Sequence, residues 1–250
     1  MKIQLSHKFE DIISVGNLLL TWGEFINGKK NKKDVQEFSL CLMDNIFQLN
    51  SELKNQTFKH SPYTPFFVCD PKLRKIHKAT VKDRVLHHAV FRVLYPIFDK
   101  SFIADSYSCR NYKGTHRAVN RLRGFALRVS QNNTRNCFVL QCDIKKFFDS
   151  IDHKILLELL KKKIQDEKMF WLLDRIVGSF SVFTGVGLPL GNITSQLFAN
   201  IYLNEFDQFI KHKLRLKFYI RYCDDFIILS ENKKDISLAI SAEILKSPPY

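Results

Sequence analysis

The sequence predicts a mixed α+β fold, and three observations support this class. Several segments repeat apolar residues at helical spacing, a few short apolar runs are typical of strands, and 45% of the 250 residues are hydrophobic, enough for a substantial core. The formal net charge of +14 favours a polyanionic partner such as nucleic acid. No apolar run approaches the roughly 20 residues of a membrane-spanning helix, so we expect no membrane partner and a cytoplasmic location. The six cysteines form no Cys-x-x-Cys pair, which argues against zinc.

Helices are expected wherever apolar residues recur every three to four positions. The segments are 35–53, 81–96, 117–130, 153–163, 167–179, 193–210 and 235–246. Thr80 with Asp83 forms a capping pair for the second helix, and Pro96 is expected to end or kink it. Asp152 and Asp166 are expected N-caps of the fourth and fifth helices.

Strands are expected at three places. Residues 66–69 form a short strand after a proline-containing stretch, and residues 137–143 form a largely buried strand whose apolar run stops at Asp143. Residues 218–229 consist of two apolar runs around Asp224 and Asp225, which predicts a β-hairpin with acidic residues at its tip.

Two apolar segments of the sequence each lead into carboxylates, which predicts one acidic site. Asp143 and Asp224 are 81 residues apart and could meet in one sheet. Grouped carboxylates repel each other unless cations neutralise them, and their hard oxygen atoms suit Mg²⁺. Two such ions roughly 3.5 to 4 Å apart support phosphoryl transfer. Acidic residues in a hairpin turn often serve only the turn, but the apolar flanks here favour a functional site.

Four motifs in the same order resemble those of reverse transcriptases over roughly residues 70 to 230. They are Asp105-Ser106-Tyr107-Ser108-Cys109-Arg110 with Gly114-Thr115-His116-Arg117-Ala118, then Asp143-Ile144-Lys145-Lys146-Phe147-Phe148-Asp149-Ser150-Ile151, then Gly187-Leu188-Pro189-Leu190-Gly191-Asn192-Ile193-Thr194-Ser195-Gln196, and finally Tyr222-Cys223-Asp224-Asp225. The first resembles a fingers motif of bacterial, group II intron-like enzymes. The last resembles the Tyr-x-Asp-Asp box.

The third motif carries a subfamily signal. Group II intron enzymes usually have Gln-Gly followed by Ser-Pro there, whereas this chain has Leu190-Gly191 and Ser195-Gln196. That pattern is similar to reverse transcriptases of diversity-generating retroelements. The resemblance implies an error-prone RNA-directed DNA polymerase that copies an RNA template into cDNA, encoded by a bacterium, archaeon or phage. Its expected partners are an RNA template, a DNA or RNA primer, deoxynucleoside triphosphates and a small basic accessory protein.

The resemblance also assigns roles to individual residues. Asp143, Asp224 and Asp225 would be catalytic and would hold two Mg²⁺ ions, with Mn²⁺ as the alternative ion. Phe148 would exclude a 2′-hydroxyl, Tyr222 would lie against the primer end, and Leu190 would lie under the incoming base pair, where it cannot make the hydrogen bonds of a glutamine. The remaining candidates for nucleotide or template binding are Gly191, Gln196, Arg110, Arg74, Lys75, Lys78 and Arg84.

The same resemblance predicts the domain organisation. We expect the right-hand arrangement of polymerases, with fingers and a palm whose small antiparallel sheet is backed by helices. Residues 1–136 would hold an N-terminal segment and the fingers, and residues 137–250 an incomplete palm, with part of the fingers interleaved at about 151–190. The helical thumb that follows the palm in this family is expected to be missing.

Three alternatives stay open from the sequence. The chain could be a group II intron or retron-like reverse transcriptase, or a nucleic-acid-binding remnant without catalysis. A metal-dependent nuclease could use the same carboxylates, but that function would leave the box from Leu190 to Gln196 unexplained.

Overall fold

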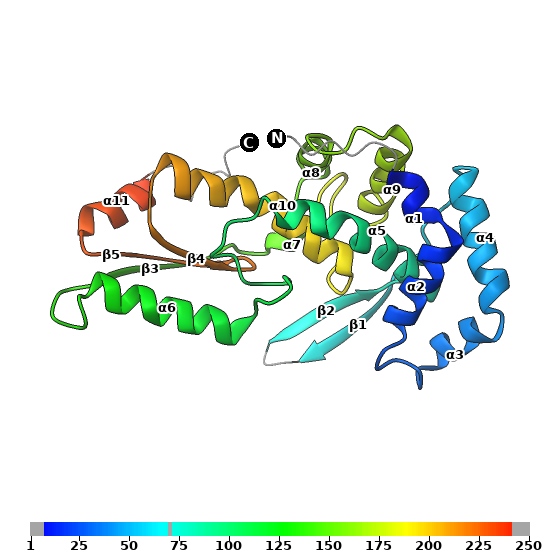
Figure 1. Ribbon diagram of the computed structural model, residues 1–250, viewed down its shortest axis with the longest axis horizontal. Coiled ribbons are helices and arrows are strands. Elements are labelled where there is room, and N and C mark those ends of the chain that lie inside the picture. The colour runs from blue at the N-terminus through cyan, green and yellow to red at the C-terminus, as the bar shows by residue number, and fades with distance from the viewer. Residues whose placement is uncertain (1–7, 70–71, 242–250) are drawn as a thin grey trace. The chain divides into compact units, whose positions relative to one another are not determined.

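The computed structural model describes residues 8–69 and 72–241 and has the expected mixed α+β composition (Figure 1). The strands are β1 (Thr64–Cys69), β2 (Leu73–Lys78), β3 (Phe138–Asp143), β4 (Phe218–Tyr222) and β5 (Asp225–Ser230). The helices are α1 (Lys8–Ile13), α2 (Val15–Phe25), α3 (Lys33–Leu40), α4 (Leu42–Lys54), α5 (Val81–Asp99), α6 (Thr115–Val129), α7 (Phe147–Ser150), α8 (His153–Lys161), α9 (Glu167–Val177), α10 (Ile193–Gln208), the π-helix η1 (Phe209–Lys213) and α11 (Lys233–Ser241).

The chain divides into two compact units, each built from two segments. Unit 1 comprises residues 1–98 and 148–198, and unit 2 comprises residues 99–147 and 199–250. This division differs from the expected boundary at residue 136, because residues 99–136 group with the sheet that carries Asp143. The backbone N–H of Tyr107 donates to the carbonyl of Arg221 in β4 (3.0 Å), and α6 packs on β4 and β5.

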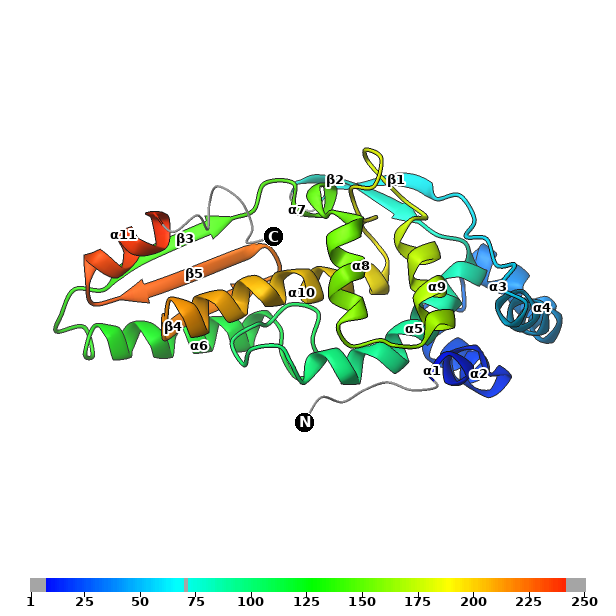
Figure 2. The same cartoon turned by 90° about the horizontal axis from the view of Figure 1, so that it is seen from above.

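Unit 2 is organised around a three-stranded antiparallel sheet in the order β3-β5-β4. Helix α6 covers one face of the sheet. The end of α10, together with η1, covers the other face (Figure 1, and from above in Figure 2). The face toward α10 buries Tyr219, Phe226 and Ile228 against Phe206 and Ile210. The face toward α6 buries the residues Ile220 and Leu229 against Ala118, Phe125 and Val129. Burial on both sides fixes the position of the hairpin that carries Asp224 and Asp225.

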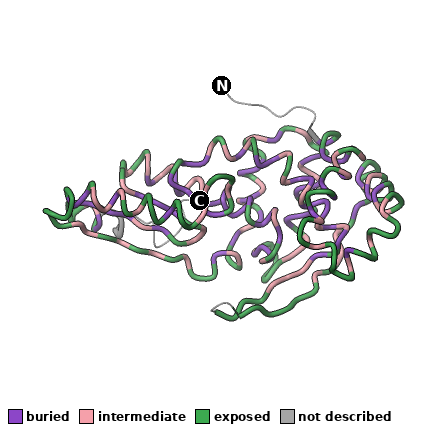
Figure 3. The backbone as a smooth tube through the Cα atoms, turned by 60° about the horizontal axis from the view of Figure 1, so that its bottom comes forward, coloured by how far each residue is buried: buried purple, intermediate pink, exposed green. Residues whose placement is uncertain are grey.

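Unit 1 combines helices with the β1–β2 hairpin. The two strands pair in antiparallel register from Thr64 opposite Lys78 to Cys69 opposite Leu73. Every residue of β1 is exposed, whereas β2 is exposed in its first half and half-buried in its second, and Figure 3 shows both colours along this hairpin. The exposed side chains include Phe67, at 64% of its full accessibility.

Several expected elements are confirmed. The helices at 117–130, 153–163 and 167–179 appear as α6, α8 and α9, and the hairpin at 218–229 appears as β4 and β5. The capping pair is present, since Thr80 Oγ1 donates to Asp83 Oδ2 (2.5 Å) and the Asp83 N–H donates to Thr80 Oγ1 (3.3 Å). Asp152 and Asp166 accept N–H bonds from the first turns of α8 and α9.

Other expectations need correction. The helix expected at 35–53 is two helices, because the backbone leaves the helical region at Cys41 (φ −118°, ψ 39°). Helix α5 does not end at Pro96, which was one of the two expected effects of this proline, but continues to Asp99. Strand β3 is not largely buried: its residues alternate between half-buried and exposed, because only Phe138, Leu140 and Cys142 point to the face that packs toward α10. Strand β2 was not expected. Of the helix expected at 235–246, residues 242–246 lie outside the described part.

Among the described residues, no helix combines the length and the apolar character needed to cross a membrane.

Candidate active site

Three carboxylates meet at one end of the sheet in unit 2. Asp143 ends β3 and Asp225 begins β5, and the antiparallel register places these two residues directly opposite each other. Asp224 lies in the turn between β4 and β5. Each residue offers one carboxylate oxygen, and these three oxygens all lie within 4.8 Å of one another. The structure thus brings together the two motifs that the sequence separates by 81 residues.

This grouping is chemically suited to a divalent cation. Like charges directly across a sheet destabilise it, so a cation that neutralises them stabilises the arrangement. The donors are hard carboxylate oxygens, which are the ligands Mg²⁺ and Mn²⁺ prefer. Asp143 and Asp225 are exposed and Asp224 is half-buried, so an ion and a phosphate can reach them. Within the described parts of the chain, no other group of three potential ligands meets this geometric test.

The turn that carries Asp224 is a tight one. Tyr222 pairs with Asp225, which leaves Cys223 and Asp224 as a two-residue loop. Cys223 has φ +57°, a conformation that costs energy for any residue except glycine. Burial raises the pKa of the Cys223 thiol to about 12, with the nearby Asp224 adding to the effect. The hard carboxylate oxygens beside this thiol suit Mg²⁺ better than its sulfur atom does.

Tyr222 is partly exposed beside this turn. The residue is 38% accessible, and its hydroxyl accepts a hydrogen bond from Thr115 Oγ1 at the start of α6 (3.1 Å). The tyrosine is thus held from the neighbouring helix while its ring stays open to solvent.

Sequence reasoning missed the one charged residue of strand β4, Arg221. Its guanidinium is completely buried and is hydrogen-bonded to Asp207 of α10. The signal available in the sequence was a charged residue inside the apolar run 218–222, one position before the box.

Arg110, predicted to bind nucleotide or template, is also in unit 2 but is engaged within the protein. Its Nε donates to Asp99 Oδ1 (2.7 Å), and its Nη1 donates to the carbonyls of Ile103 (2.7 Å) and Ser106 (3.0 Å). The side chain is 6% accessible. These contacts hold the loop before α6 in place.

Three of the residues predicted for nucleotide or template binding line one pocket in unit 1, of about 400 Å³. They are Lys78, Arg84 and Gly191. Asp34 accepts from Lys78 Nζ (2.8 Å) and from Arg84 Nη2 (2.5 Å). Burial raises the pKa of Asp34, but the two cations more than offset this and hold it below its usual value. Lys29 and Lys32 also line the pocket, so cations outnumber carboxylates.

The remaining candidates are spread over unit 1. Arg74 and Lys75 are exposed on β2, and Gln196 is exposed on the first turn of α10. The Leu190 carbonyl accepts from the His77 N–H of β2 (2.9 Å). Phe148 is half-buried, and its carbonyl accepts from the Leu188 N–H (2.7 Å). The roles assigned to these side chains stay predictions.

Comparison with known proteins identifies the family. The model of the family described as reverse transcriptase (RNA-dependent DNA polymerase) matches residues 59–247. The chain belongs to the reverse transcriptase family. Protein YkfC of Escherichia coli (strain K12) is 28% identical over 149 residues, which cover 57% of this chain and 38% of YkfC. Group II intron-encoded protein LtrA of Lactococcus lactis subsp. cremoris is 29% identical over 184 residues, which cover 70% of this chain and 29% of LtrA.

A solved structure shares the fold of this reverse transcriptase chain. One chain of a partial Cas6-RT-Cas1--Cas2 complex matches with a TM-score of 0.55 at 21% identity, covering 94% of this chain and 42% of that one. The present chain therefore spans less than half the length of these relatives.

Proposed function

We propose that this protein is an RNA-directed DNA polymerase that joins deoxynucleotides to a primer at the carboxylates of unit 2. The observation that carries this proposal is the placement of Asp143 opposite Asp225, with Asp224 in the adjoining turn. The three aspartates would hold divalent cations, which would supply activation of the attacking hydroxyl and stabilisation of the leaving oxygen in a phosphoryl transfer. The protein's own part is to hold three carboxylates on a rigid sheet edge that solvent and a triphosphate can reach.

We assign the palm to unit 2 and the fingers to unit 1. The palm assignment is supported by the sheet with its carboxylates and by the two covering layers of helix. The fingers assignment is supported by the cationic residues on and beside the β1–β2 hairpin. Lys78 and Arg84 with the pocket that they line, and Arg74 and Lys75 on β2, are suited to bind phosphates of the template or of the incoming nucleotide.

Phe148 and Tyr222 are proposed to act on the sugar and the primer. From the resemblance of its motif, the bulky ring of Phe148 would leave no room for a 2′-hydroxyl, and the exposed side chain of Tyr222 would offer a surface for the primer end. Phe148→Ala is expected to increase ribonucleotide incorporation relative to deoxynucleotide incorporation by at least about tenfold, since a lost steric exclusion of this size is worth about 1.4 kcal/mol or more. An unchanged ratio would remove Phe148 from the sugar site.

For the subtype, we propose an error-prone enzyme of the diversity-generating kind, with Mg²⁺ as its ion and a small basic accessory protein. Support comes from Leu190 and from Ser195-Gln196 in the third motif. The similarity to LtrA and YkfC favours a second candidate, a group II intron-like enzyme. Misincorporation concentrated at template adenines would favour the first, and uniform fidelity the second.

The experiment that tests the activity is primer extension on matched RNA and DNA templates with Mg²⁺. The protein, expressed from its whole reading frame, is supplied with deoxynucleotides or ribonucleotides. We expect extension on RNA with deoxynucleotides. Extension only on DNA, or only with ribonucleotides, would contradict the proposed function.

A further inference from the structure

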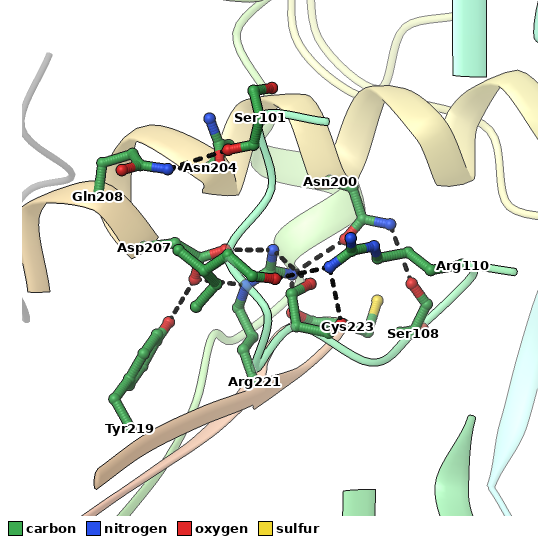
Figure 4. Close-up of polar contacts among 12 residues, drawn as sticks. Ser101, Ser108, Arg110, Asn200, Asn204, Asp207, Gln208, Tyr219, Arg221 and Cys223 are labelled. Atoms are coloured by element: carbon green, nitrogen blue, oxygen red, sulfur yellow. Dashed lines mark hydrogen bonds and ion pairs between the residues drawn. The ribbon is translucent and has the colours of Figure 1, made fainter. Parts of the chain in front are cut away.

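Arg221 is a buried cation whose every donor is used. The guanidinium carries five N–H groups. Nε donates to Asp207 Oδ1 (2.8 Å), Nη2 to Asp207 Oδ2 (2.7 Å) and Ser106 Oγ (3.2 Å), and Nη1 to Asn200 Oδ1 (3.2 Å) and the Cys223 carbonyl (2.8 Å). Figure 4 shows this side chain between Asp207, Asn200 and Cys223.

The ion pair with Asp207 is an unusual feature for the interior of a sheet. Both side chains have no accessible surface, and Tyr219 donates its hydroxyl to Asp207 Oδ1 (2.6 Å). Buried ion pairs cost desolvation energy, and well-packed apolar residues would serve stability equally well or better. The pair is therefore better explained by what it positions than by the stability it adds.

What it positions is the loop of the Tyr-x-Asp-Asp box. The Cys223 carbonyl that accepts from Arg221 belongs to the peptide group that leads into Asp224. Cys223 is held at φ +57°, so this loop needs external contacts to keep its conformation. Arg221 is itself fixed on both sides, because its N–H donates to the Asp105 carbonyl (3.0 Å) and its carbonyl accepts from the Tyr107 N–H (3.0 Å).

We propose that Arg221 is a positioning residue for the divalent-cation site. Anchored on Asp207 of α10, it holds the peptide before Asp224 so that the Asp224 carboxylate lies within reach of Asp143 and Asp225. This inference deepens the proposed function and rests on the cation site that the three aspartates form.

The test measures Mn²⁺ binding directly, without catalysis. Free Mn²⁺ is followed by electron paramagnetic resonance during titration of the full chain and of the variants Asp224→Asn, Arg221→Lys and Lys211→Met. Arg221→Lys keeps the charge but loses the planar fork that reaches both Asp207 and the Cys223 carbonyl. Lys211→Met is the matched control: Lys211 is a largely buried cation in unit 2 that donates to Asp105 Oδ2 (3.2 Å) and to the Lys217 carbonyl (2.8 Å). The variant leaves in place the Asp105 carbonyl that accepts from Arg221 and the ion pair of Asp105 with Arg121 (2.8 Å).

We expect Arg221→Lys to weaken Mn²⁺ binding about 10-fold or more, the range typical for loss of a group that orients a metal ligand. Lys211→Met should keep the wild-type affinity, and Asp224→Asn should lose the saturable site. If Arg221→Lys does not fold, Arg221→Met with Asp207→Asn removes both charges together and leaves no unpaired buried ion. This double variant is expected to show the same weakening of Mn²⁺ binding.

Wild-type Mn²⁺ affinity in a folded Arg221 variant would overturn the proposal, and so would an equal loss in Lys211→Met. If Asp224→Asn binds Mn²⁺ as the wild type does, the cation site itself is wrong and the proposal fails with it. That outcome differs from failure of the positioning role alone, in which Asp224→Asn loses binding and Arg221→Lys keeps it.

Discussion

Gly191 determines how closely strand β2 approaches the loop before α10. Its φ is +114°, in the region that favours glycine, and a Cβ at this position would lie 2.8 Å from Ile76 Cγ2. The neighbouring Leu190 carbonyl accepts from His77 of β2. Glycine is therefore required here both by the backbone conformation and by the space available.

Gly191→Ala is expected to lower the free energy of unfolding by roughly 1 to 3 kcal/mol, because it adds a strained φ and a steric clash. The matched control is Gly124→Ala in helix α6, where no atom of the surroundings lies within 4 Å of the new Cβ. That change should raise the free energy of unfolding by about 0.5 to 1 kcal/mol. Urea denaturation of both variants measures the difference. Equal effects would show that Gly191 is not sterically required.

Single residues also show where sequence reasoning reaches its limit. The aspartates could be predicted because a charged carboxylate at the end of an apolar strand is unfavourable unless it has a function there. The contacts of Arg110 and Arg221 could not be predicted, because each depends on acceptors from other segments, such as Asp99 and Asp207. A sequence gives the charge of an arginine but not whether its acceptors come from the protein or from a ligand.

At the scale of elements, α5 is joined to its neighbours by a buried histidine. His87 Nδ1 lies 2.6 Å from Thr194 Oγ1 of α10, and its Nε2 lies 3.0 Å from His60 Nε2 in the segment before β1. Burial lowers the pKa of His87 to about 3, and His60 and His88 add to the effect. The ring is therefore neutral in the folded protein at pH 5 to 7.

This shift predicts a loss of stability in acid. The pKa of His87 is lower in the folded state than its ordinary value of 6.5, so between those values the unfolded chain binds a proton that the folded chain does not. Lowering the pH from 7 to 5 should therefore reduce the free energy of unfolding by about 2 kcal/mol through this residue. His87→Gln should remove that part of the pH dependence, as urea denaturation at both pH values would show. The exposed His116→Gln should keep it, and an unchanged pH dependence in His87→Gln would contradict the assignment.

The elements that differed from expectation did so because of tertiary context. Pro96 removes one helical N–H, but Tyr95 and Phe98 on either side of it are buried, so packing carries α5 on to Asp99. Strand β3 has an apolar sequence, yet Val139 is 57% exposed, because the β3 residues that pack against the core on the α10 side are Phe138, Leu140 and Cys142, on the opposite face from Val139. Local periodicity predicts that an element exists, and its neighbours decide how far it extends and which face is covered.

At the scale of the whole molecule, the motifs along the chain predicted that the carboxylates meet, whereas the expected domain boundary did not predict which segments form each unit. Both units are assembled from two separate segments, and unit 2 gathers 99–147 with 199–250. The carboxylates belong to these two segments, so their meeting could be predicted from the motifs. The grouping of residues 99–136 with the sheet could not, because it depends on pairing of Ser106 with Arg221 across the fold.

The net charge of +14 predicts strongly salt-dependent binding to RNA. Each phosphate that the protein neutralises releases counterions, so affinity for a single-stranded RNA should fall at least about tenfold between 50 and 200 mM salt. Fluorescence anisotropy with a labelled RNA measures this. Affinity that does not change with salt would show that the charge is not used to bind the backbone.

The central claim is that three aspartates from two distant motifs form one site for DNA synthesis. The most direct measurement is primer extension on an RNA template with Mg²⁺ by the protein expressed from its whole reading frame. Asp143→Asn, Asp224→Asn and Asp225→Asn are compared with Asp149→Asn, which removes an exposed carboxylate of the same motif as Asp143. We predict that each of the first three variants loses at least about 100-fold in rate, as when a group that stabilises the transition state is removed, and that Asp149→Asn stays near the wild-type rate. Wild-type extension by Asp224→Asn, or an equal loss in Asp149→Asn, would contradict the claim.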